Sequence, residues 1–553
     1  MTTLAHGMTA LPWLAQQSWG IDWTKVPSLS AAGLLVWAFV GAVLFAELFG
    51  LIAARSYFGR IWTIARLTVV QAARMKVAAV LILFVLSLSL VLPFILRTDD
   101  TAYGRIRVAI TYTLYAAEFL LCVLTLFLST SVLCSEFQGK QIYGLDVKPV
   151  PRWCILAGKW LGVMIVNVGL LACVGVIVWA IATYQARLPQ FALRVITEKT
   201  HPVEKAYIER ARENNEVMRS RIMTAREVFM PRMADGRPFT AVVDMQAVAE
   251  FDRLKKEGLL PKDRSEAWCL DTLRRRINNE IFVVPTEGAA MWRINSLPTD
   301  LPPETWITLR FLYHGSPRPE KNEITGVWRI GRFDLDKKDF SGEYYFEAPL
   351  TYKCDQINDI PIKAGSIDPK TGTLTVHFLN VPQPQSPKAA FPADNGLAVL
   401  IPVGGLGVNL FRGLLLILAK LAYLAALGVF CAAFLGFAVA AFSASTIFIV
   451  SLAAPFLLME VIDKLYIVGS SMVRPGSPME WGDVAVRVVL SSILTLFPDF
   501  TQYDPVPYLS DGLATPYGLV GHAMFSLVAL RAGVLGLLGS YIFHRRELAA
   551  LDR

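Results

Sequence analysis

The stretch Glu136–Lys159, EFQGKQIYGLDVKPVPRWCILAGK, is short, polar and basic, and it lies between two long apolar segments, Val108–Leu133 and Trp160–Ala182. At about 1.5 Å of rise per residue, each flanking segment is long enough to cross a bilayer as a helix. The stretch is therefore predicted to be a loop at a membrane surface. Its basic residues outnumber its acidic ones, which places the loop in the cytoplasm. Pro149 and Pro151 interrupt any continuous helix through it.

The composition of the whole chain agrees with a membrane protein. The 553 residues are 54% hydrophobic, and the mean hydropathy of +0.46 exceeds that of ordinary soluble globular proteins. The net charge of +8 is accounted for by basic cytoplasmic loops. The sequence carries no motif typical of nucleic-acid binding. We therefore expect membrane lipids, and no nucleic acid, among its partners.

Apolar segments of sufficient length predict seven membrane-spanning helices. They are Ala31–Ala53, Val77–Ile95, Val108–Leu133, Trp160–Ala182, Gly413–Ala438, Thr446–Ile462 and Leu519–Phe543. A further half-apolar segment, Val484–Phe497, is too short to cross comfortably and is predicted to be re-entrant or interfacial.

The segment Arg55–Lys76, between the first two spans, is predicted to be an amphipathic helix in the membrane interface. Its apolar residues recur at helical spacing, and polar and basic residues lie opposite them. Basic residues mark this helix, the loop Glu136–Lys159 and the end of the last span, His544–Arg546, as cytoplasmic. This pattern predicts an N-terminus outside the cell and a C-terminus in the cytoplasm.

The polar region 185–395 is extracytoplasmic in this topology and too long to be a loop, so we expect a folded domain. Its first part has helical patterns and its second part has β-branched and aromatic runs typical of a small antiparallel sandwich. The predicted helices are Val203–Phe229, Met245–Lys256 and Glu266–Ile277, and the predicted strands are Thr305–Tyr313, Gly326–Phe333, Glu343–Tyr352 and Gly372–Leu379. Prolines between 382 and 392 predict a stiff linker back to the membrane.

The chain is thus expected to have four parts. Residues 1–54 hold an N-terminal segment and an extra span. Residues 55–184 form the first half of a membrane core, which includes the cytoplasmic loop 134–159. Residues 185–395 form the extracytoplasmic α+β domain, and residues 396–553 form the second half of the core with its cytoplasmic C-terminus.

The seven cysteines contain no C-x-x-C pair, so no metal or redox site is predicted. Cys269 and Cys354 share the polar region. They are the candidate disulfide pair, and the alternative is two separate thiols.

Four charged residues interrupt the apolar spans: Glu47, Glu118, Lys420 and Arg531. A charge near the bilayer centre costs about 2.5–3.5 kcal/mol, so such groups are expected to face the protein interior or a cavity. In a functional interpretation, Glu118 pairs with Arg531 and lines a path between the two halves. In a structural interpretation the charges form ion pairs, or Lys420 extends to the outer surface.

The loop resembles the signature loop of type-2 ABC transporter permeases, the membrane subunits of ABC exporters. In that family an acidic residue and a Gly are followed by a Leu, a Lys-Pro pair, an Arg and a Gly-Lys pair at the start of the next helix. The matching residues are Glu136, Gly139, Leu145, Lys148, Pro149, Arg152, Gly158 and Lys159. Lys140 and Pro151 depart from the pattern, where the family usually has Thr and Ser.

Three further segments are similar to the same family: the interfacial helix, Leu496–Phe500, and Phe543–Leu548 at the end of the last span. The resemblance covers about Tyr57–Ala182 and Phe411–Leu548. It implies a core of six spans, with the first span and the inserted domain as additions.

The resemblance also implies a function, the permease subunit of an ABC exporter in the cell (inner) membrane. No Walker A motif occurs, so ATP is expected to be bound and hydrolysed by a separate ATPase subunit that contacts the loop. We expect no catalytic residue, cofactor or metal in this chain, and a second permease copy or homologue as a partner. Two alternatives remain: a non-transporting scaffold that presents an extracytoplasmic recognition domain, and a membrane-anchored enzyme, against which the scattered Asp and His residues argue.

Overall fold

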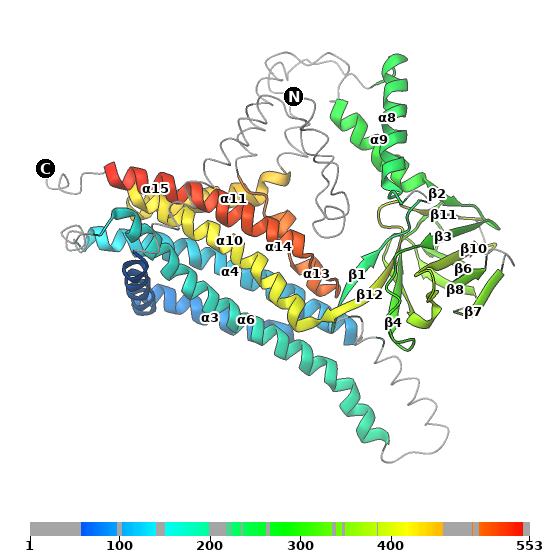
Figure 1. The fold of residues 1–553 in the computed structure, drawn as a ribbon, viewed down its shortest axis with the longest axis horizontal. Coiled ribbons are helices and arrows are strands. Elements are labelled where there is room, and N and C mark those ends of the chain that lie inside the picture. The colour runs from blue at the N-terminus through cyan, green and yellow to red at the C-terminus, as the bar shows by residue number, and fades with distance from the viewer. Residues whose placement is uncertain are drawn as a thin grey trace. The chain divides into compact units, whose positions relative to one another are not determined.

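The computed structural model describes residues 57–96, 102–139, 150–197, 217, 221, 223–233, 236–260, 266–334, 339–345, 349–383, 385–456, 489 and 497–545 (Figure 1). The chain divides into two compact units. The helical unit comprises Met1–Arg212, Gly405–Leu457 and Ile493–Arg553, and the β-rich unit comprises Glu213–Gly404 and Leu458–Ser492. The predicted span Ala31–Ala53, with Glu47, and nearly all of Val484–Phe497 lie outside the described residues.

Among the described residues, six helices are long and apolar enough to cross a membrane. These stretches are Lys76–Pro93, Gly104–Gln138, Arg152–Ala186, Leu406–Phe434, Phe437–Ala454 and Tyr517–Arg545. They belong to α3 (Lys76–Ile95), α4 (Ala102–Gln138), α6 (Arg152–Thr197), α10 (Leu406–Phe434), α11 (Phe437–Phe456) and the continuous run α14 (Tyr517–Ala523), η7 (Met524–Ala532) and α15 (Gly533–Arg545). Six of the seven predicted spans therefore correspond to helices suited to a membrane.

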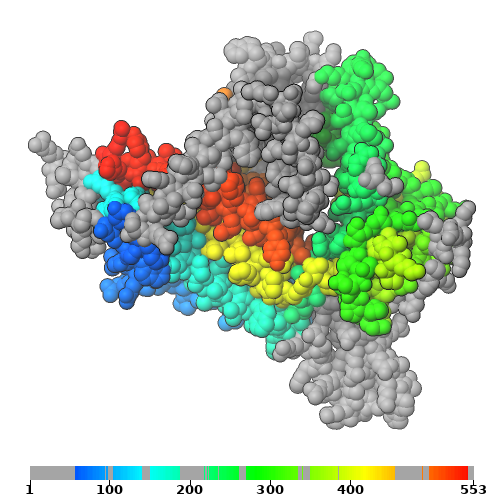
Figure 2. All heavy atoms as spheres, viewed as in Figure 1, coloured from blue at the N-terminus to red at the C-terminus, as the bar shows by residue number. Residues whose placement is uncertain are grey.

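The centre of the helical unit is formed by α4 and α10, which are the most deeply buried of these helices. Close approach of the two is possible because Gly428 on α10 faces Ser129 on α4, where a side chain at 428 would collide. Figure 2 shows α10, in yellow, between α6, in teal, and the orange-red C-terminal helices. Helices α3 and α11 expose large apolar side chains such as Leu83 and Phe442, as expected of surfaces that contact lipid.

The predicted interfacial helix is present as a helix over 57–74. It packs closely against α6 at two glycines. A Cβ atom at Gly158 would lie 2.7 Å from Ile64, and one at Gly162 would lie 2.5 Å from Thr68. The spacing of four residues places both glycines on one face of α6, where they let the two backbones approach closely.

Two helical details differ from the sequence expectations. The apolar stripe of the helix over 57–74 is divided, because Phe58 and Trp62 are exposed while Ala65 and Ala72 are buried against the protein. The fifth and sixth predicted spans are separated at residues 435–436, earlier than expected. Gly is a poor helix former, and Gly436 at this point ends α10 and lets α11 begin at once.

The β-rich unit contains three sheets, with strand orders β1-β12-β4-β9, β3-β10-β6-β7 with β8 also on β6, and β2-β11-β5. The strands are β1 (Thr224–Phe229), β2 (Phe282–Val284), β3 (Ala289–Ile294), β4 (Trp306–Phe311), β5 (His314–Ser316), β6 (Glu323–Asp334), β7 (Asp339–Tyr345), β8 (Pro349–Lys353), β9 (Asn358–Lys363), β10 (Leu374–Asn380), β11 (Lys388–Phe391) and β12 (Leu397–Gly405). Two helices, α8 (Thr240–Lys256) and α9 (Glu266–Glu280), pack against each other. A separate β-sheet domain is therefore present, as expected.

Aromatic side chains fill the core of the β-rich unit. Trp328 is 1% exposed, and its ring centroid lies 4.4 Å from that of Phe311 and 4.7 Å from that of Phe378. Phe391 and Tyr313 extend the same cluster. Such rings contribute both buried area and specific edge or offset contacts, so the unit has a hydrophobic core of its own.

The boundaries of this unit differ from the predicted 185–395. The predicted start, residue 185, lies within α6, which continues to Thr197. Part of the predicted linker is instead a strand, because β11 occupies Lys388–Phe391. The chain then forms β12, which runs directly into α10. Two secondary-structure predictions also change: Thr224–Phe229 is a strand and not the end of a helix, and Glu343–Tyr352 is divided between β7 and β8.

The candidate disulfide does not form, since Cys269 and Cys354 are not joined. Cys269 is buried on α9, whereas Cys354 follows β8 and belongs to the core cluster between the sheets. Burial raises the pKa of the Cys354 thiol to about 11. This thiol is therefore protonated at neutral pH and acts as a small hydrophobic side chain.

Candidate functional site

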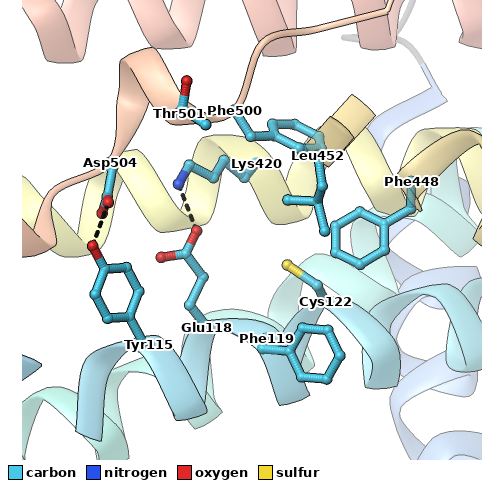
Figure 3. Close-up of a pocket in the computed structure, with 10 residues that line it drawn as sticks. All are labelled: Tyr115, Glu118, Phe119, Cys122, Lys420, Phe448, Leu452, Phe500, Thr501 and Asp504. Carbon is cyan, nitrogen blue, oxygen red and sulfur yellow. Dashed lines mark hydrogen bonds and ion pairs between the residues drawn. The ribbon is translucent and has the colours of Figure 1, made fainter. Parts of the chain in front are cut away.

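The helical unit contains a cavity of about 330 Å³ bordered by α4, α10, α11 and the segment around η6 (Thr501–Tyr503) (Figure 3). Its volume is within the range of pockets that hold small ligands. The lining residues are Tyr115, Glu118, Phe119, Cys122, Lys420, Phe448, Leu452, Phe500, Thr501 and Asp504.

One end of this pocket is charged. Lys420 Nζ donates a hydrogen bond to Glu118 Oε1 at 2.5 Å, and the two side chains are only 5% and 14% exposed. Beside them, the Tyr115 hydroxyl donates to Asp504 Oδ2 at 2.7 Å. Asp504 Oδ1 in turn accepts the backbone N–H of Val506 at 2.9 Å, which begins α13 (Val506–Ser510). Figure 3 shows the two pairs side by side.

The pairing within the spans differs from the functional interpretation of the sequence. Glu118 pairs with Lys420 and not with Arg531, whose guanidinium donates to the Ser526 hydroxyl on its own helix. Lys420 also does not extend to the outer surface, because α4 packs along α10 and supplies a carboxylate within reach. The structural interpretation, an ion pair between spans, therefore holds for Glu118 and Lys420.

The other end of the pocket is apolar and opens toward the surface. It is formed by Phe119, Phe448, Leu452 and Phe500 (Figure 3). Phe119 is 56% exposed and Leu452 is 44% exposed, whereas Phe448 is buried. The cavity thus joins the buried charges to the apolar outer surface of the helical unit.

A second cluster of polar residues lies where α4 ends and α6 begins. The Lys159 ammonium on α6 donates to the Glu136 carboxylate on α4, and both side chains are almost completely buried. Lys159 also donates to Gln71 Oε1 at 3.2 Å, and Gln71 donates to Ser135 Oγ at 2.8 Å. Because Gln71 lies on the helix over 57–74, the cluster connects three helices.

Arg152, at the first position of α6, connects this region to the C-terminal helix. Its guanidinium donates to the carbonyls of Phe543 and His544 at 3.1 and 3.2 Å. These carbonyls belong to the last turn of α15, where a cation satisfies orphan acceptors and the helix dipole favours positive charge. Arg152 also lies over the Phe543 ring, 5.9 Å from its centroid.

The residues predicted to form the cytoplasmic loop do not all lie in a loop: some are in helices, and others lie outside the described residues. Glu136 and Lys159, expected on a polar loop, are buried in α4 and α6, because α4 continues beyond its apolar run to Gln138. Gly158 packs against the helix over 57–74, and Gly139 is exposed just after α4. Leu145, Lys148 and Pro149 lie outside the described residues.

Sequence reasoning missed Gln71, Ser135, Tyr115 and Asp504 as members of these clusters. Of the four, Tyr115 is the one that the sequence could have indicated. It precedes Glu118 by three residues and so lies on the same face of its helix. The other three are brought into place by tertiary packing alone.

In the described ranges, no group of three or more His, Cys, Asp or Glu side chains is placed to hold a metal ion. Comparison of the chain with protein-family models, with curated proteins and with solved structures finds no match in any of the three. The functional assignment therefore depends on the geometry of the chain itself.

Proposed function

We propose that this chain is the transmembrane permease subunit of an ATP-binding cassette exporter, which moves a substrate using ATP hydrolysed by a separate subunit. The observation that supports this most is the cluster where α4 ends and α6 begins, which flanks the predicted cytoplasmic loop. There Glu136 and Lys159 join α4 to α6, and Gln71 adds the helix over 57–74. Arg152 adds α15. A partner that displaces the loop would thus displace four helices together.

The burial of the Glu136–Lys159 pair makes this connection costly to break. Removing one member of a buried ion pair typically costs about 3–5 kcal/mol, because the remaining charge is left without compensation. Helix ends joined in this way are expected to move together when a partner displaces them. Packed side chains and hydrogen-bond or salt-bridge networks of this kind can carry energetic coupling between sites.

In this proposal the loop 140–149 and the C-terminus are cytoplasmic, and the β-rich unit is extracytoplasmic. The span Ala31–Ala53 is the seventh, in addition to the six described, and the β-rich unit collects or releases substrate outside the membrane. A second copy or homologue completes the transport path. The charged pocket supplies a polar position within otherwise apolar helices.

The test is co-purification of the tagged full chain in mild detergent, followed by assay of magnesium-dependent ATP hydrolysis in the eluate. We expect an ATPase subunit to co-purify with the wild type and to be lost in Lys148→Glu, which reverses charge in the loop. The matched control is Lys353→Glu, an exposed residue of the β-rich unit. An eluate without any ATPase subunit would contradict the proposal.

A further inference from the structure

The charged pocket of the helical unit also indicates which substrate class it takes, an inference that rests on the proposed function. Lys420 is 4% exposed. An ammonium has three N–H donors, and the described part of the chain offers Lys420 one acceptor, Glu118 Oε1. The remaining donors are therefore available to a ligand that brings an acceptor of its own.

Glu118, in contrast, has an acceptor oxygen that lacks a donor. Its second carboxylate oxygen, Oε2, is buried and has no hydrogen-bond partner among the described residues. The nearby Tyr115 hydroxyl does not supply one, because it donates to Asp504. An unsatisfied buried carboxylate oxygen is costly, so this position calls for a hydrogen-bond donor, best a cationic one.

The charges of the side chains that line the pocket limit the class of headgroup that it can bind. The lining contains two carboxylates, Glu118 and Asp504, and one ammonium, Lys420. A purely anionic headgroup would meet a net negative pocket, and a purely cationic one would leave the Lys420 donors unused. A zwitterionic headgroup satisfies both, with its ammonium at Glu118 and its anionic group at Lys420.

The apolar end of the pocket adds a hydrocarbon chain to this headgroup. Phe119 and Leu452 are exposed on the apolar surface of the unit, so chains can extend outward from the cavity. We infer that the pocket binds a bilayer phospholipid whose zwitterionic headgroup carries a primary ammonium and a phosphate, with its acyl chains along Phe119, Phe448 and Leu452.

The test is native mass spectrometry of the full chain in detergent with equimolar phosphatidylethanolamine and phosphatidylglycerol of identical acyl chains. We expect the wild type to retain the ethanolamine lipid preferentially. Glu118→Gln should reduce this preference about tenfold, which corresponds to about 1.4 kcal/mol. Leu452→Trp, which fills the apolar end without changing a charge, should reduce retention of the lipid even if Glu118→Gln does not fold. Tyr112→Phe, an exposed residue on α4 outside the pocket, should leave both unchanged.

Equal retention of the two lipids by the wild type would overturn the inference, as would wild-type preference in folded Glu118→Gln or undiminished retention in Leu452→Trp. Glycerophosphoethanolamine, which lacks acyl chains, should not displace the lipid at millimolar concentration. Displacement would show a water-soluble zwitterion as the ligand and would overturn the choice of a lipid. Because no ATP or ATPase subunit is present, a failure here leaves the proposed function standing, and a missing ATPase subunit in the co-purification leaves this binding result standing.

Discussion

Strand β12 should decide whether the β-rich unit folds in isolation. The perturbation is a truncation: a fragment of residues 213–404 is compared with one of residues 213–395, which lacks the strand. In the sheet, β12 lies between β1 and β4. Its removal therefore detaches β1 and leaves β4 as an open edge.

The magnitude follows from burial. Four large apolar side chains of β12 are at most 5% exposed, namely Leu397, Val399, Leu400 and Ile401. At about 1.5–3 kcal/mol for each fully buried side chain, the truncation removes about 6–12 kcal/mol. A whole domain is typically stable by only about 5–15 kcal/mol. The shorter fragment is therefore expected to be unfolded or only partly folded.

The assay is urea unfolding followed by tryptophan fluorescence, for which the buried Trp292 and Trp328 are suitable reporters. Residues 213–404 should unfold cooperatively. Residues 213–402 are the matched control, since positions 403–404 are exposed and their loss should change little. If the 213–395 fragment unfolded cooperatively at the same urea midpoint, the reasoning from β12 would be refuted.

Three further predictions concern single residues. Glu136→Ala should destabilise the purified full chain by about 3–5 kcal/mol, because Lys159 loses its buried partner. The double replacement Glu136→Leu with Lys159→Met should recover much of this stability in a thermal-inactivation assay. A Glu136→Ala variant as stable as the wild type would contradict the burial of the pair. Gly162→Leu should separate the helix over 57–74 from α6 and abolish a cysteine cross-link engineered between them, whereas Gly169→Leu, which has open space, should keep it. Burial lowers the pKa of His377 on β10. As the pH falls through about 6.5, the unfolded chain therefore takes up a proton that the folded chain does not. The stability of the folded chain should fall from pH 7 to pH 5, and His377→Gln should flatten that dependence in thermal melts.

The six helices that are long and apolar enough to cross a membrane were predictable, because such helices appear in the sequence as long apolar runs. The ends of α4 and α6 were not, because Glu136 and Lys159 are polar and read as a loop. Their burial depends on a pairing between residues 23 positions apart. In the same way, the sequence marks Glu118 and Lys420 as unusual charges, but their partnership joins positions separated by 302 residues.

The β-rich unit was predicted as a class, and its end was misplaced for a physical reason. The apolar run that begins at Leu397 has the composition of either a buried strand or the start of an apolar helix, and short apolar runs cannot be distinguished by periodicity. Proline residues before it favoured a linker, yet Lys388–Phe391 still forms β11. The pocket could not be predicted from the sequence, because its lining residues come from α4, α10, α11 and the η6 segment, which are far apart along the chain.

A lipid exporter should move lipid when ATP is supplied, which can be measured in proteoliposomes that contain this chain with its co-purified ATPase subunit. Headgroup-labelled phosphatidylethanolamine is placed in one leaflet and its appearance in the other is followed with and without ATP. We expect movement that requires ATP hydrolysis and is lost in Leu452→Trp. ATP hydrolysis by the reconstituted complex without any lipid movement would contradict this expectation and would favour a non-transporting scaffold.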